Sequence, residues 1–110
     1  MKKIFLLILL PVSLFFSCVG DRNASETMDR AAILLGANPD SAYILLNEVK
    51  TPDRLNERQF ARWCMLYCRA ADKLFKDMLY TEQLDRALAW CKNHGTAEQR
   101  AWMGIYLGRS

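Results

Sequence analysis

Apolar residues recur at helical spacing in every segment after residue 25, and this feature constrains the fold more than any other. A first set follows the positions i, i+3, i+4 and i+7 and consists of Met28, Ala31, Ala32 and Leu35. A second set with the same spacing consists of Ala42, Leu45, Leu46 and Val49. No segment alternates apolar and polar residues as a half-buried strand does. The spacing therefore predicts an all-α domain of about five antiparallel helices joined by short loops.

Capping residues predict where three of these helices begin. Asn38 can cap the second helix, because an asparagine side chain accepts hydrogen bonds from the first turn. Asn56 can cap the third helix, with Gln59 three residues later as in a capping box. Thr96 and Gln99 repeat this arrangement at the start of a fifth helix.

The other helix boundaries depend on single residues. Ser25 is expected to cap the first helix, with Gly36 near its end. Thr81 opens the fourth helix, and Gly95 is expected to supply a left-handed cap after it. The third helix should run to about Lys76, and the fifth has not ended when the chain does.

The first 17 residues have the composition of an export signal. Lys2 and Lys3 precede an apolar stretch from Ile4 to Phe16, and Ser17 closes it. The stretch is shorter than the roughly 20 apolar residues that a membrane-spanning helix needs. The two lysines also supply most of the formal charge of +3, so the rest of the chain is close to neutral. A near-neutral domain lacks the basic surface typical of nucleic-acid binding, so no nucleic-acid partner is expected.

A short motif ends this leader and reads Leu14-Phe15-Phe16-Ser17-Cys18. It resembles the lipobox of bacterial lipoproteins, in the looser form usual in the Bacteroidetes. The resemblance implies that Cys18 is acylated and anchors the protein to a membrane of the cell envelope, facing either the periplasm or the cell surface. We therefore expect a signal peptide over 1–17, a lipidated cysteine and tether over 18–25, and a helical domain over 26–110. An ordinary secreted protein, cleaved near Cys18, is the alternative.

Several strings in the domain resemble the N-terminal part of tetratricopeptide-type lipoproteins of the Bacteroidetes. They are Asn38-Pro39-Asp40-Ser41-Ala42, Leu45-Leu46-Asn47-Glu48-Val49, Trp63-Cys64-Met65-Leu66, Ala70-Ala71-Asp72-Lys73, Asn93-His94-Gly95 and Tyr106-Leu107-Gly108-Arg109. The resemblance implies a solenoid of helical hairpins that contacts other proteins through its concave face. Because this array stops inside a helix, it also implies a truncated form, or a partner or second copy that covers Ile105, Tyr106 and Leu107 at the C-terminal helix.

Aromatic side chains are the candidate binding residues. Trp63 and Tyr67 lie one turn apart on the third predicted helix, and Trp102 and Tyr106 lie one turn apart on the fifth. Most aromatic residues of a small domain belong to its core, but one or two of these four are expected to line a concave groove as anchors. Two other sets are interpreted as structural, namely a solvated face of Arg58, Arg62 and Arg69 and a close-packed seam of Ala97, Ala101, Gly104 and Gly108.

Residues with catalytic or metal-binding chemistry are few. Cys64, Cys68 and Cys91 are expected to act as small buried apolar residues, with a Cys64–Cys91 bridge as the alternative in an oxidising compartment. A metal site would need more ligands than these and His94 supply, so no metal or cofactor is expected. No nucleophile elbow or phosphate-binding glycine loop is present, so no catalytic activity is predicted.

The sequence thus predicts a lipid-anchored envelope protein with a tetratricopeptide-like module for protein–protein interaction and no catalysis. One alternative is the periplasmic sensor segment of a truncated, membrane-bound transcriptional regulator. A second is the remnant of a nutrient-binding helical lipoprotein, a class that needs a much longer chain.

Overall fold

The computed structural model describes residues 23–110, and this part of the chain is helical outside its loops. The elements in chain order are a helix over residues 23–37, α2 (Pro39–Asn47), the short 3₁₀-helix η1 (Pro52–Arg54), α3 (Glu57–Lys73), α4 (Thr81–His94) and α5 (Ala97–Arg109). The predicted all-α class is therefore confirmed, whereas the leader and Cys18 lie outside the described residues. Within 23–110, none of the helices combines the length and the hydropathy that crossing a bilayer requires.

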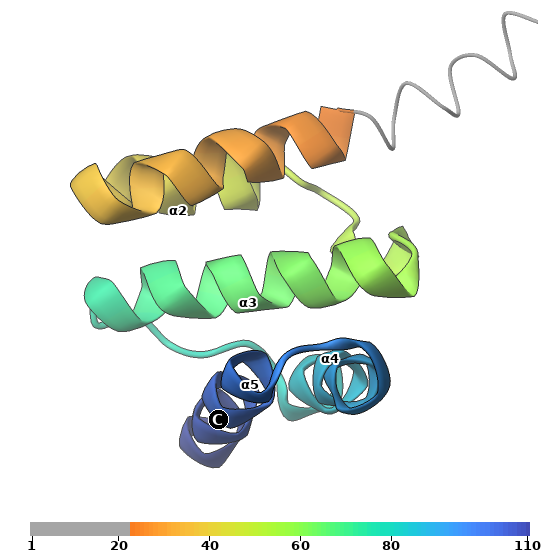
Figure 1. Cartoon of the computed structure of the whole chain (residues 1–110). Helices are drawn as coiled ribbons and strands as arrows, with labels where there is room; N and C mark the ends of the chain where they lie inside the picture. Colours follow the sequence, from red (N-terminus) through yellow and green to blue (C-terminus); the bar gives the residue numbers. More distant parts are fainter. Residues whose placement is uncertain (1–22) are drawn as a thin grey trace, which may run out of the picture.

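The central element of the domain is α3. The helix over 23–37 and α2 lie on one side of it, and α4 and α5 lie on the other (Figure 1). It packs directly on α2, α4 and α5, and α4 in turn packs on α5. A helix with neighbours on several sides must be apolar around much of its circumference. Its buried residues are accordingly Phe60, Ala61, Trp63, Cys64, Leu66, Cys68, Ala70 and Ala71.

The predicted caps at the starts of three helices are confirmed. Asn38 accepts a hydrogen bond from the backbone N–H three residues later at 3.2 Å, and Asn56 does the same at 2.8 Å. Thr96 accepts one at 3.1 Å, and the Gln99 side chain accepts from the Thr96 backbone N–H at 2.9 Å, which completes a capping box. Each cap pairs a backbone donor that the helix itself leaves without an acceptor.

The predicted start of the first helix is wrong. Residues 23–25 are already helical, so Ser25 lies inside the helix and the tether does not extend to it. Ala24 is buried in the core together with Met28, which explains why helix is favoured there. Ala32, which the spacing placed inward, is exposed, because the buried stripe of this helix is narrower than predicted.

The ends of α3 and α4 also differ from the prediction. The final helical residue of α3 is Lys73, not Lys76, and Phe75 adopts the left-handed conformation (φ 56°) that closes the helix. Gly95 does not adopt that conformation, since its φ is −89°. A glycine is needed there for another reason, because a Cβ atom would lie 2.9 Å from the carbonyl oxygen of Cys91.

The side chain of Arg86 ties α4 to the start of α3. Its guanidinium pairs with the Glu57 carboxylate (2.6 Å) and donates to the carbonyl oxygens of Asp53 (3.0 Å) and Leu55 (3.2 Å). It also lies 3.9 Å from the centre of the Phe60 ring. The hydrogen bond from Arg86 lowers the pKa of Glu57. Four contacts from one planar cation fix the position of α4 along α3.

The exposed face of α5 corrects two further expectations. The small residues predicted to form a close-packed seam are all exposed, namely Ala97, Ala101, Gly104 and Gly108. Apart from the neighbouring backbone of α5 itself, no atom lies within 4 Å of a Cβ placed on Gly104 or Gly108. The predicted exposure holds for Ile105 (52%) but not for Tyr106, which is buried, and Leu107 is half-buried. The reason is that α5 packs on α3 and α4 through Met103 and Tyr106 instead.

Candidate functional site

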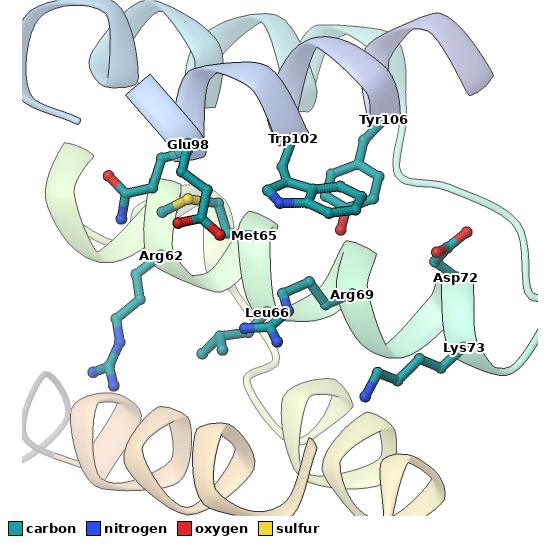
Figure 2. Close-up of a pocket in the computed structure, with 10 residues that line it drawn as sticks. Arg62, Met65, Leu66, Arg69, Asp72, Lys73, Glu98, Trp102 and Tyr106 are labelled. Atoms are coloured by element: carbon teal, nitrogen blue, oxygen red, sulfur yellow. The ribbon is translucent and has the colours of Figure 1, made fainter. Parts of the chain in front are cut away.

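A groove lies between α3 and α5 (Figure 2). Its volume is about 470 Å³, which is within the range of small-molecule and side-chain binding sites. The residues that line it come from two helices only: Arg62, Met65, Leu66, Arg69, Asp72 and Lys73 from α3, and Glu98, Gln99, Trp102 and Tyr106 from α5. The lining therefore combines apolar and charged side chains in one place.

The apolar part of the groove is built around two aromatic rings on α5. Trp102 and Tyr106 are four residues apart, so both project from α5 toward α3 (Figure 2). Their ring centres are 5.8 Å apart with an angle of 25° between the planes, which is a stacked pair. Tyr106 is buried, whereas Trp102 is 46% exposed. The tyrosine thus anchors α5 to the domain and leaves half of the indole open to the groove.

The charged part of the groove lies mostly on α3. Arg62 pairs with Asp29 of the helix over 23–37 at 2.8 Å. The Lys73 ammonium donates to the carbonyl oxygen of Leu35, near the end of the same helix, at 3.1 Å. Arg69 is exposed and forms no ion pair with any residue in 23–110. The two outer cations therefore bind the helix over 23–37, one through a carboxylate and one through a backbone carbonyl group, and the middle one is left available.

An ion pair closes one end of the groove. Asp72 of α3 pairs with Arg109 near the end of α5, so it links the two walls. The other carboxylate in the lining, Glu98, is exposed at the first turn of α5. The lining contains no cysteine, histidine or serine. Its chemistry is that of a binding surface with apolar contact and charge.

The other two predicted anchors, Trp63 and Tyr67, lie away from the groove in the contact between α2 and α3. The indole N–H of Trp63 donates to the carbonyl oxygen of Leu46 at 3.0 Å, and the residue is only 4% exposed. Its ring centre is 5.1 Å from that of Tyr67, whose hydroxyl is 3.0 Å from the hydroxyl of Tyr43. All polar atoms of this aromatic cluster (Tyr43, Trp63 and Tyr67) are thus used internally, which is a structural role.

Burial raises the pKa of Tyr67 and of Tyr106. For Tyr67 the hydrogen bond with Tyr43 adds to the effect of burial. Both hydroxyls therefore stay protonated at physiological pH. Neither one is poised to take part in proton transfer there.

The three cysteines of the domain are free and buried. Burial raises the pKa of Cys64 and Cys91, and it raises that of Cys68 to about 12. A thiol that stays protonated is a poor nucleophile and a poor metal ligand. No group of three or more potential metal ligands occurs within 23–110, and the His94 ring instead packs 5.4 Å from Trp90. The cysteines therefore fill space in the core, and the alternative Cys64–Cys91 bridge is not formed.

Sequence reasoning missed most of the α3 wall of the groove. The sequence pattern indicates a solvated face for Arg62 and Arg69, but Arg62 is half-buried and pairs with Asp29. Together with Met65, Leu66 and Lys73 they form one stripe at helical spacing, and that spacing was the available signal. The stripe mixes apolar and charged residues, so periodicity alone could not separate it from an ordinary boundary between core and solvent.

The four predicted anchors thus divide into two pairs with different surroundings. Trp63 and Tyr67 are packed and hydrogen-bonded within the domain, whereas Trp102 and Tyr106 line an open groove. Arg58 is exposed on α3 outside the groove. In comparisons with known proteins, no family, no curated protein and no solved structure matches this chain.

Proposed function

We propose that this protein is a lipid-anchored component of a bacterial cell envelope whose helical domain binds another protein and has no catalytic activity. The leader and the lipobox-like motif before Cys18 support the location. The groove between α3 and α5 supports the binding role. The domain acts as a tetratricopeptide-like module, held near the membrane by the acylated cysteine.

One observation carries the binding role, namely the half-exposed indole of Trp102 in a concave site. Tryptophan is among the residues that contribute most to protein–protein binding, because it buries a large apolar area and offers one hydrogen-bond donor. Tyr106 holds this side chain by stacking against it. A pre-positioned aromatic ring loses little freedom on binding, which favours affinity.

The arrangement of the helices supports the tetratricopeptide-like interpretation. The helix over 23–37, α3 and α5 lie side by side, with α5 above α3 and the first helix below it in Figure 2. Ion pairs join both neighbours to α3, through Asp29 and Arg62 on one side and through Asp72 and Arg109 on the other. These three are the first helices of successive hairpins, and in such an array they form the face that contacts a partner.

A site-specific crosslinking experiment in the native envelope tests the binding role. A photoreactive phenylalanine analogue in place of Trp102 should capture one defined partner. The same analogue in place of Ile44, which is 61% exposed on α2, is the matched control. Equal capture from both positions, or none from position 102, would contradict the proposed site.

A second experiment tests the anchor separately. Cys18→Ala should abolish labelling with palmitate and release the protein from membranes, because no acyl chain can then be attached. Cys68→Ala, which removes a buried thiol of the domain, should leave labelling unchanged. Labelling that persists in the Cys18→Ala variant would exclude lipidation at this residue.

A further inference from the structure

The charges along the groove indicate what kind of protein segment it accepts. Arg62, Arg69 and Lys73 lie at i, i+7 and i+11 on α3, so all three face the same side of the helix. The rise of an α-helix spreads them over about 16 Å, the length of roughly five residues of extended chain. A row of cations therefore runs along one wall of the groove, opposite Trp102 and Tyr106.

The three cations differ in the partners that their positive charges already have. Arg62 is paired with Asp29, and Lys73 is held by a backbone carbonyl group. Arg69 is exposed and has no ion-pair partner among the described residues. The nearby carboxylate of Asp72 is occupied by Arg109. A ligand thus meets the positive charge of Arg69 at the middle of the groove.

Glu98 on the opposite wall determines at which end of the groove an acidic group of the ligand can lie. Glu98 is the first acidic residue of α5 and lies near the Arg62 end of the groove (Figure 2). An acidic group on the ligand is repelled at that end and attracted toward Arg69 and Lys73. Trp102 lies one turn after Glu98, between the two ends. The site therefore has an apolar contact with a positive charge on one side of it.

From these contacts we propose that the groove binds an internal acidic segment of a partner protein, with an apolar side chain against Trp102 and a neighbouring carboxylate on Arg69. The inference rests on the proposed function, because it names the partner for the same groove. The volume of about 470 Å³ holds only a few side chains, so the contact is short. Exposed ion pairs contribute modestly, so the carboxylate sets specificity more than affinity.

Blocked synthetic peptides test this inference on the full-length protein in detergent micelles. The first probe is an acetylated and amidated peptide with one tryptophan flanked by glutamates, and the second has glutamine in place of each glutamate. The acidic peptide should bind more tightly than the neutral one by about threefold or more. Blocking both ends ensures that a terminal carboxylate does not supply the charge.

Variants of the protein locate the contact. Arg69→Gln should weaken binding of the acidic peptide by about threefold and leave the neutral peptide unaffected. Trp102→Ala should weaken both peptides by about tenfold or more, because it removes the aromatic anchor. Arg58→Gln, an exposed arginine of α3 outside the groove, is the control and should change neither.

The following outcomes would overturn the inference. Equal binding of both peptides, or no binding of the acidic one, would remove the role of charge. Displacement of the acidic peptide by an oligothymidylate at lower concentration would identify a polyanion site instead. Capture of a partner by the crosslinker at position 102, together with charge-independent peptide binding, would leave the proposed function standing and refute only this inference.

Discussion

The aromatic pairs Trp63–Tyr67 and Trp102–Tyr106 lie in different surroundings. In the aromatic cluster, Trp63 and Tyr67 are covered by α2 and their polar atoms are hydrogen-bonded within the protein. In the groove, Trp102 is half exposed, and Tyr106, which stacks on it, is buried. Both pairs have the same residue types at the same spacing of four. The comparison shows that the covering element, and not the local sequence, decides which pair holds the fold and which is free to bind.

The largest expected effect is a difference in the free energy of unfolding that is lost when each of the two tryptophans is replaced by alanine. Trp63→Ala should lower the free energy of unfolding by about 3–5 kcal/mol, because it leaves a cavity and removes the donor to the Leu46 carbonyl group. Trp102→Ala should lower it by less than about 1.5 kcal/mol, since half of the indole is already in water. Urea unfolding monitored by circular dichroism measures both. Similar losses for the two variants would break the comparison.

The next effect concerns alkaline pH and the thiol of Cys68, whose charge would act on both Tyr67 and Tyr106. Burial raises the pKa of Cys68 to about 12. Above the ordinary pKa of a thiol, the unfolded chain loses this proton while the folded chain keeps it. The contribution of the Cys68 thiol to the free energy of unfolding is therefore fully present below about pH 9. It falls by about 1.4 kcal/mol per pH unit as the pH rises toward 12.

Urea midpoints measured between pH 8 and pH 12 should follow this decline. The Cys68→Ala variant should decline less steeply over the same interval, because one titrating group is gone. If the two slopes are equal, the thiol is not buried as the structure describes it.

A smaller effect compares the two tyrosine hydroxyls. Tyr67→Phe should cost about 0.5–1.5 kcal/mol, since it breaks the hydrogen bond to Tyr43. Tyr106→Phe should cost close to nothing, because its hydroxyl forms no hydrogen bond with another residue in 23–110. A double-mutant cycle of Tyr43→Phe with Tyr67→Phe should show non-additive losses. Equal losses at positions 67 and 106 would contradict the assignment of the two pairs.

The smallest effect lies outside both aromatic pairs and serves as their control. Phe75→Gly should raise the free energy of unfolding by about 0.5–1 kcal/mol, because this residue has a φ of 56° that glycine adopts without strain. Phe75 is also 93% exposed, so little packing is lost. Phe75→Leu should give no such gain. Neither substitution should change peptide binding in the groove. A loss of stability in Phe75→Gly would contradict the prediction and show that the exposed ring makes a stabilising contact.

Much of the local structure followed from the sequence, as Asn56 shows. A cap, its partner and the first turn are all within four residues, so their hydrogen bond depends on almost nothing else. Ser25 shows the limit of the same reasoning. Its side chain could cap a helix, but the helix already includes residues 23 and 24, because burial of Ala24 favours helix there. That burial depends on residues distant in sequence.

The long-range contacts that join the helices were not predictable in this way. Arg86 reaches Glu57, 29 residues earlier in the chain, and Arg109 reaches Asp72, 37 residues earlier. Each was an ordinary charged residue on a predicted helix surface. The small residues of α5, including Gly104, predict a packed seam but are exposed. Small residues indicate where another helix can approach closely, but not whether one does.

The sequence by itself determined that this domain is helical and where most of its helices begin, since helical spacing and caps are interactions between residues a few positions apart. The tertiary structure decided how wide the covered face of each helix is and which of the two aromatic pairs it includes, as the exposed Ala32 in the first helix shows. Trp63 with Tyr67 and Trp102 with Tyr106 are equivalent in sequence, and α2 packs over the first pair while the second lines a groove. The physical reason is that burial is a property of the whole packed arrangement, whereas spacing is a property of one segment.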